Sequence, residues 1–215
     1  MVATKEELGS QSPPGATPAA GTRVADSPHI ADPGALGLGA FAMTTFVLSV
    51  FNAGLINVSV EAVVLPIAFF YGGIVQLLAG MWEFRRGNTF AATAFASYGA
   101  FWLTFAGFIT RIAPHLSPTH AYQALGVYLL AWAIFTAYMM LAALRVNVAV
   151  LGVFVALTVT FVLLTIGAFG QSSSMDKAGG WAGLVTAAIA WYASFAYVTN
   201  NTWKKTLLPV GSLRR

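Results

Sequence analysis

Six long apolar stretches dominate the chain, and short segments between them hold most of the charged residues. The stretches are Leu36–Val58, Ala62–Trp82, Thr89–Thr110, Ala121–Leu144, Val148–Gly170 and Ala178–Thr199. An α-helix that crosses a bilayer core of ~30 Å needs about 20 mostly apolar residues. Each stretch is therefore predicted to be one membrane-spanning helix. The predicted fold class is an all-α integral membrane protein with six transmembrane helices.

Composition and charge agree with this fold class. Hydrophobic residues make up 58% of the chain and charged residues 8%, with a mean hydropathy of +0.74. Soluble domains carry about 25% charged residues, so a water-soluble fold is excluded. The net charge of +4 is not gathered into a basic patch, so no nucleic-acid partner is expected.

The chain is divided into three regions. Residues 1–34 are rich in Pro, Gly, Ala, Ser and Thr and are expected to form a disordered cytoplasmic tail, because they cannot bury enough apolar surface to fold. Residues 35–203 form a single six-helix transmembrane domain, and residues 204–215 a short basic cytoplasmic tail. The absence of cysteine excludes disulfides and thiolate metal sites.

The loop charges predict the orientation in the membrane. If the N-terminus is cytoplasmic, nine of the eleven Lys and Arg residues lie on the inner side, and only Arg111 and Lys177 lie outside. Positive residues favour cytoplasmic loops. We therefore expect a multi-pass protein of the cell (plasma) membrane with both termini in the cytoplasm.

A faint internal repeat divides the six helices into two halves of three. At an offset of 89 residues Ala35-Leu36-Gly37 falls on Ala124-Leu125-Gly126, and Trp102 falls on Trp191. Three helices per half would place the halves in opposite orientations, as in the inverted repeats of many transporters. Chance matches between apolar sequences are the competing explanation.

Residues for enzyme chemistry are missing from the apolar stretches. His29, His115 and His120 lie in the tail and in one loop, and no Gly-rich phosphate-binding motif is present. Metal-dependent and nucleophilic enzymes need clustered ligands or a base beside the nucleophile. The chain is therefore not expected to be an enzyme or to bind a cofactor or metal.

Uncharged polar residues inside the apolar stretches are the candidates for a substrate pathway. They are Thr44, Thr45, Ser49, Asn52, Tyr71, Gln76, Ser97 and Thr104, together with the indole of Trp102. Thr45, Ser49 and Asn52 share one helix face, and Phe41 begins the same stripe. The stripe fits a narrow pathway, but it equally fits hydrogen bonds between packed helices.

Two longer blocks resemble a known family of transporters. "YGGIVQLLAGMWEFRRGNTFAATAFASYGAFW" covers residues 71–102, and "LGLGAFAMTTFVLSVFNAG" covers residues 36–54. These blocks, with weaker ones further along the chain, are similar to the acetate uptake transporter family, the succinate–acetate permeases of bacteria, archaea and fungi.

The resemblance implies a homohexamer embedded in membrane lipid, in which each protomer carries acetate, and possibly succinate, through its own pathway. It further implies a hydrophobic gate of Phe41, Tyr98 and Leu157. Other positions that match family motifs are Tyr71, Gln76, Glu83, Asn88 and Trp102. A channel and a proton-coupled symporter both remain open, as does a sensor of acetate or ammonium without significant flux.

Two acidic residues near the expected cytoplasmic mouth need separate mention. Where the family has Asn-Pro-Ala-Pro-Leu-Gly-Leu, this chain begins the corresponding segment with Asp32, which adds a carboxylate. Glu83 stands beside Arg85 and Arg86 at a membrane edge. It either anchors the helix end, as interfacial charges commonly do, or relays protons.

Overall fold

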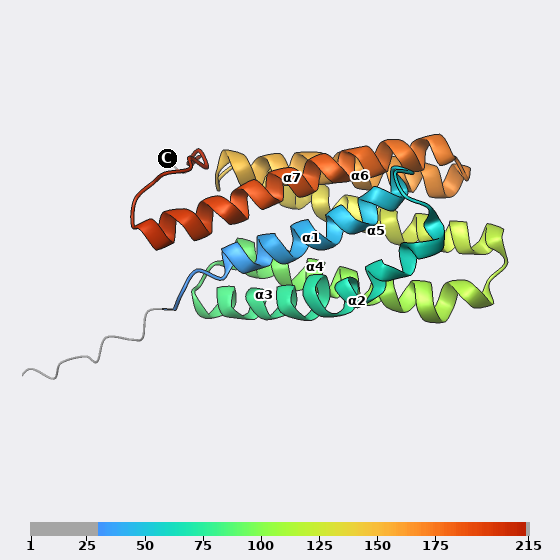
Figure 1. Cartoon of the computed structure of the whole chain (residues 1–215), viewed down its shortest axis with the longest axis horizontal. Coiled ribbons are helices and arrows are strands. Elements are labelled where there is room, and N and C mark those ends of the chain that lie inside the picture. Colours follow the sequence, from blue (N-terminus) through green and yellow to red (C-terminus); the bar gives the residue numbers. More distant parts are fainter. Residues whose placement is uncertain (1–29, 214–215) are drawn as a thin grey trace, which may run out of the picture.

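The structure is a computed structural model in which residues 30–213 are described, so most of the expected N-terminal tail lies outside the described residues. The six predicted spans are confirmed as six helical segments that are long and apolar enough to cross a membrane (Figure 1). The spans are α1 (Gly34–Asn52), Val58–Arg85, Thr89–His115, α5 (Pro118–Ala143), α6 (Val148–Gly170) and α7 (Ser173–Trp203).

The second span is built from four short pieces. A 3-10 turn, η1 (Val58–Val63), leads into α2 (Val64–Phe69), the π-helical η2 (Phe70–Val75) and α3 (Gln76–Arg85). Gly72 of η2 lies against Thr44 of α1, where an added Cβ would stand 2.5 Å from Oγ1. The wide π turn thus coincides with a close contact between helices, and such turns are frequent at functional sites.

The third span likewise changes its winding near its end. It consists of α4 (Thr89–Gly107), the π-helical η3 (Phe108–Ile112) and the 3-10 turn η4 (Ala113–His115). It therefore runs five residues beyond the predicted end at Thr110. α7 also exceeds its predicted range at both ends.

Helix ends follow local signals. The side chains of Asn88, Ser117 and Asn147 accept hydrogen bonds from backbone N–H groups at the starts of α4, α5 and α6. α1 ends at Asn52, earlier than the predicted Val58, because Gly54 adopts a φ of +74° and the chain turns.

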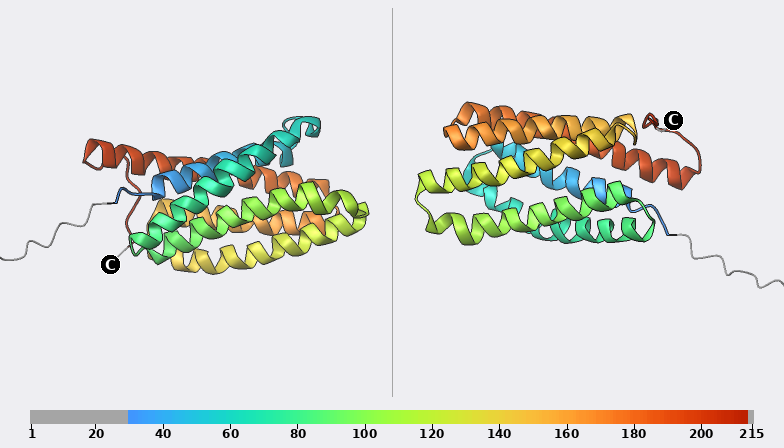
Figure 2. Two further views of the ribbon diagram at one scale, coloured as in Figure 1. Left: turned by 90° about the horizontal axis from the view of Figure 1, so that it is seen from below. Right: turned by 180° about the vertical axis from the view of Figure 1, so that it is seen from behind.

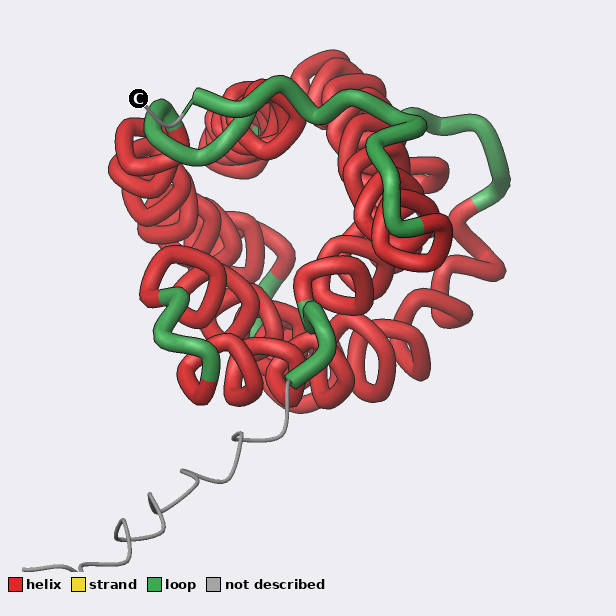
Figure 3. The backbone as a smooth tube through the Cα atoms, turned by 90° about the vertical axis from the view of Figure 1, so that its left-hand side faces the viewer, coloured by secondary structure: helices red, strands yellow, loops and turns green. Residues whose placement is uncertain are grey.

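The helices form a bundle around a central axis. α7 packs along both α1 and α6, α5 packs along α6, and α3 packs along α4. Views from below, from behind and along the axis show the spans running side by side in a ring (Figures 2 and 3). Because α1 begins and α5 ends at the same end of the bundle, the two three-span halves run in opposite directions, while their similarity as a repeat stays a prediction.

The first and last described residues lie at one end of the bundle, which we call the near end; the other is the far end (Figure 1). Beyond Lys204 the chain turns back as a strap of residues 206–213. The Asn200 side chain binds the backbone of Leu207 and Leu208, and Val148 N–H donates to the carbonyl of Gly211 at 2.7 Å. The first part of the predicted C-terminal tail is therefore packed against α6 and α7.

Candidate functional site

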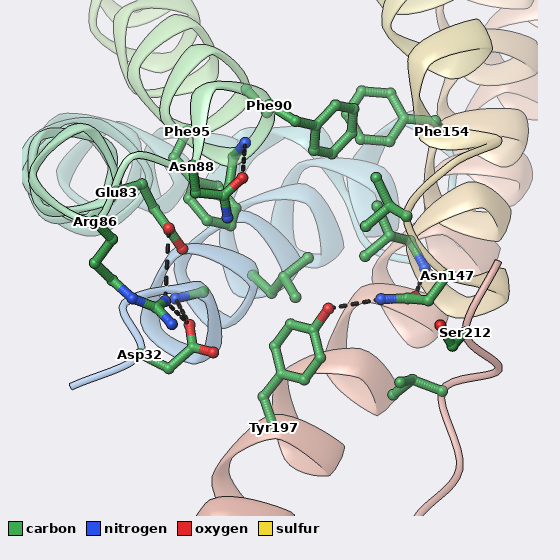
Figure 4. A pocket seen from close by; sticks show the side chains of 17 residues that line it. Asp32, Glu83, Arg86, Asn88, Phe90, Phe95, Asn147, Phe154, Tyr197 and Ser212 are labelled. Atoms are coloured by element: carbon green, nitrogen blue, oxygen red, sulfur yellow. Dashed lines mark hydrogen bonds and ion pairs between the residues drawn. The ribbon is translucent and has the colours of Figure 1, made fainter. Parts of the chain in front are cut away.

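Two cavities open into the bundle, one at each end. The near cavity has a volume of about 410 Å³ and lies among the ends of α1, α3, α4, α6 and α7 at the near end, with part of the strap (Figure 4). The far cavity has a volume of about 470 Å³ and lies among α1, α4, α5, α6 and the start of α7. The bundle is thus hollowed from both sides.

The two cavities approach each other within one turn along α1 and α6, and within about two turns along α4. In α1 the lining changes from Leu38 in the near cavity to Phe41 in the far cavity, and in α6 it changes from Phe154 to Leu157. In α4 Phe95 lines the near cavity and Phe101 lines the far cavity. One helical turn rises about 5.4 Å, so the barrier between the cavities is short.

The three residues of the predicted gate lie near this barrier: Phe41 and Leu157 line the inner end of the far cavity, and Tyr98 packs against Phe41. Phe41, Tyr98 and Leu157 are each no more than 4% exposed. The ring centroids of Phe41 and Tyr98 are 5.5 Å apart, and Phe154, one turn before Leu157, lies 6.1 Å from Tyr98. The structure therefore brings the three side chains to the level where the cavities end.

Tyr98 is held in place by a neighbour that sequence reasoning missed. Its hydroxyl shares a hydrogen bond of 2.9 Å with Thr136 Oγ1 of α5, and Thr136 Oγ1 lies 2.7 Å from the backbone carbonyl of Trp132. The rings of Trp132 and Phe135 also flank Tyr98. With its hydroxyl bound to α5, Tyr98 adds aromatic bulk to an apolar barrier.

The polar stripe of α1 forms one wall of the far cavity. Thr45, Ser49 and Asn52 all line it, and Trp102 of α4 lines the same space. Thr45 Oγ1 and Trp102 Nε1 are buried and have no hydrogen-bond partner among the described residues. A buried donor without a partner costs about 1–3 kcal/mol, so these two groups are suited to bind a ligand that accepts hydrogen bonds.

The other candidates for the pathway line neither cavity; they are Thr44, Tyr71, Gln76, Ser97 and Thr104. Thr44 Oγ1 donates to the carbonyl of Ala40 at 2.9 Å, and the Tyr71 hydroxyl lies against Gly39. Gln76 is 1% exposed, and neither of its amide atoms has a partner within residues 30–213. The structure thus places Thr44 and Tyr71 in helix packing and leaves Gln76 as a buried amide beside the bundle's π turn.

Charged groups lie on one side of the near cavity (Figure 4). Arg86 Nη1 is 2.8 Å from Asp32 Oδ1 and 3.6 Å from Glu83 Oε2. Glu83 is only 1% exposed, and its contact with Arg86 fits the role of an anchor at the helix end.

The opposite side of the near cavity is polar and uncharged. Asn147 Nδ2 donates to the Tyr197 hydroxyl at 2.8 Å, while its Oδ1 accepts from Val150 N–H and caps α6 (Figure 4). Sequence reasoning missed both residues. An Asn directly before an apolar stretch is a helix-capping signal that could have identified Asn147. Within residues 30–213 no group of three or more His, Cys, Asp or Glu side chains could hold a metal ion.

Comparison with known proteins yields consistent matches along most of the chain. The profile of the GPR1/FUN34/yaaH family matches residues 14–215. Acetate permease A of Emericella nidulans is 40% identical over 84% of this chain and 65% of its own length. The succinate-acetate/proton symporter SatP of Escherichia coli K12 is also 40% identical, over 85% of this chain and 96% of the relative.

A solved structure shares the architecture. The bacterial acetate channel SatP matches with a TM-score of 0.79 and 39% sequence identity, over 85% of this chain and all of that chain. The chain spans 62% and 65% of the lengths of two fungal relatives, and 96% of the bacterial one.

Proposed function

The chain belongs to the GPR1/FUN34/yaaH family, and from this premise we propose that it transports small carboxylates, acetate and succinate among them, across the membrane. The observation that carries the proposal is the pair of cavities that approach from opposite ends and stop one helical turn apart on α1 and α6. The named relatives are a permease, a symporter and a channel, which favours transport over catalysis and over sensing.

The far cavity supplies a binding step for the carboxylate. The hydroxyl of Thr45 and the indole N–H of Trp102 donate to the carboxylate oxygens, at the wall next to Phe41. A hydrogen bond to a charged group contributes about 1.5–3 kcal/mol. Two such bonds offset the ~2.5–3.5 kcal/mol that insertion scales assign to a charge at the membrane centre. Binding is therefore weak, as efficient passage requires.

The barrier acts as a size filter. Phe41, Tyr98 and Leu157 are apolar or aromatic at the level of closest approach, so they accept the methyl group of acetate and exclude wider molecules. The carboxylate has no hydrogen bonds only while it crosses the short apolar barrier between the two cavities. Passage as the neutral acid, or as an anion accompanied by a proton, lowers the cost of this step.

We place the protein in the plasma membrane as a homohexamer, with both termini in the cytoplasm and the near cavity facing the cytoplasm. The ends of α3, α5 and α7 lie at the near end of the bundle (Figure 1), and the residues there include Arg85, Arg86, Arg145, Lys204 and Lys205, against Arg111 and Lys177 toward the far end. This asymmetry supports the orientation, because positive residues favour the cytoplasmic side. The large apolar side chains exposed on the bundle are then covered by lipid and by neighbouring subunits.

Uptake of radiolabelled acetate into proteoliposomes that contain the purified chain tests the proposal. We expect uptake well above that of protein-free liposomes, competition by unlabelled succinate, and a weaker inhibition by bulkier acids. A pH gradient imposed across the membrane distinguishes a proton symporter, which it accelerates, from an anion channel. Acetate binding without any flux would instead establish a sensor.

A further inference from the structure

The two cavities are lined by matching sets of charged side chains, but these are paired differently. Each cavity has one cation and two carboxylates among its described lining residues: Arg86 with Asp32 and Glu83 in the near cavity, and Lys177 with Glu61 and Asp176 in the far cavity. Arg86 contacts both of its carboxylates. Lys177 forms no ion pair within residues 30–213. The cation of the near cavity is therefore paired with two carboxylates through one of its nitrogen atoms, whereas Lys177 in the far cavity forms no ion pair among the described residues.

Arg86 retains the capacity to bind a further carboxylate. Both of its ion pairs use Nη1, and its Nε and Nη2 atoms have no partner among the described residues. Its side chain is 30% exposed and lines the near cavity (Figure 4). A guanidinium group presents five donors in a planar fork and binds carboxylates through two of them at once.

The backbone at the start of α1 holds the Asp32 carboxylate against the guanidinium group of Arg86. Its Oδ1 accepts a hydrogen bond of 2.8 Å from Gly34 N–H as well as the 2.8 Å contact from Arg86. Glu83 approaches the other side of Arg86 and is almost fully buried. The three side chains carry a net formal charge of −1, so the two carboxylates weaken the attraction of Arg86 for an arriving anion.

We propose that Arg86 is the docking site for the substrate carboxylate in the near cavity, and that Asp32 is an internal competitor which makes this mouth select singly charged over doubly charged acids. The inference rests on the proposed function, since it concerns the same carboxylates. Coulomb repulsion scales with charge, so the Asp32 carboxylate opposes succinate more strongly than acetate, by up to a factor of two. At the same time it occupies part of the group that would bind either acid.

The Asp32→Asn variant tests this directly. Asn keeps an oxygen that accepts from Gly34 and Arg86 but removes the charge. At pH 7, the acetate concentration for half-maximal uptake should fall about threefold, and the succinate concentration should fall by more, up to about tenfold, because succinate carries twice the charge. Uptake is measured in inside-out and right-side-out vesicles, and the change should be confined to the population whose near cavity faces the medium.

Two arginine variants complete the experiment. Arg86→Gln should raise both half-maximal concentrations, and in this background Asp32→Asn should change the succinate-to-acetate ratio of half-maximal concentrations less than it does in the unmodified protein, because the acids no longer dock beside Asp32. Arg85→Gln is the matched control: it removes the same charge from the same helix end, but Arg85 lines neither cavity. In Arg85→Gln the ratio of the half-maximal concentrations for succinate and acetate should stay within about twofold of the ratio in the unmodified protein, as expected for a screened surface charge.

The ionic strength provides a second measurement on the unmodified protein. Salt screens exposed charges over about 10 Å at 0.1 M, so the preference for acetate should weaken as ionic strength rises from about 20 to about 300 mM. If the protein takes up acetate but neither salt nor Asp32→Asn alters the ratio of the half-maximal concentrations for succinate and acetate, the docking proposal is overturned. The proposed function is then left intact. Absence of acetate flux in the unmodified protein overturns both.

Discussion

Two adjacent threonines of α1 differ in whether their hydroxyl groups are free to bind a substrate. Thr44 Oγ1 donates to the carbonyl of Ala40, whereas Thr45 Oγ1 lines the far cavity without a partner in the described part of the chain. We expect Thr45→Val to lower the efficiency of acetate uptake about tenfold or more, because a hydrogen bond to a charged group contributes about 1.5–3 kcal/mol. Thr44→Val is the control and should change uptake less than twofold; equal losses in both variants would refute the role given to Thr45.

Leu157 tests the size filter at the same scale. Leu157→Ala removes most of a buried side chain at the barrier, so lactate uptake should rise at least severalfold relative to acetate uptake. Leu163→Ala makes the same truncation in α6 at a position that lines neither cavity, and it should leave the ratio unchanged. Competition assays with both labelled acids give the ratio. A lactate-to-acetate ratio unaffected by Leu157→Ala would remove Leu157 from the filter.

At the scale of helices, α4 and the second span are held together by a contact that excludes side chains. A Cβ added at Gly99 of α4 would stand 2.7 Å from the backbone nitrogen of Leu77 and 2.9 Å from the carbonyl of Gly73. Because backbone atoms cannot move aside easily, Gly99→Ala should destabilise the protein by about 1–3 kcal/mol. Gly107→Ala, in the same helix with nothing within 4 Å, should not destabilise it. Thermal unfolding in detergent measures both.

The helical elements also show which features can be predicted from a sequence. The bounds of α6 agree with the apolar stretch Val148–Gly170, because Asn147 caps its start and Gln171 leaves the helix with a φ of 48°. The division of the second span could not be predicted in this way. Its π turn lies where glycines meet side chains of α1 and α4, which are distant in sequence.

At the scale of the whole molecule, the sequence predicts the membrane spans better than it predicts which residues line the cavities. Six spans follow from hydropathy because a bilayer demands about 20 apolar residues in each. The helical spacing placed Thr45 on the polar stripe of α1 and left Thr44 off it, but which polar residues face a cavity depends on neighbours in other helices, so both threonines were candidates for the pathway. The ion pair of Asp32 with Arg86 joins residues 54 positions apart, and only the packing of α1 against α3 brings them together.

The shortness of the barrier has an electrical consequence. A cavity that is open to water conducts ions better than an apolar barrier does, so we expect the membrane voltage to fall mainly over the short barrier at Phe41, Tyr98 and Leu157 rather than over the full bilayer. One elementary charge that crosses this drop gains or loses about 2.3 kcal/mol per 100 mV. In liposomes held at a fixed potential, flux of bare acetate should therefore respond steeply to voltage, whereas an acid that crosses with its proton should not respond at all.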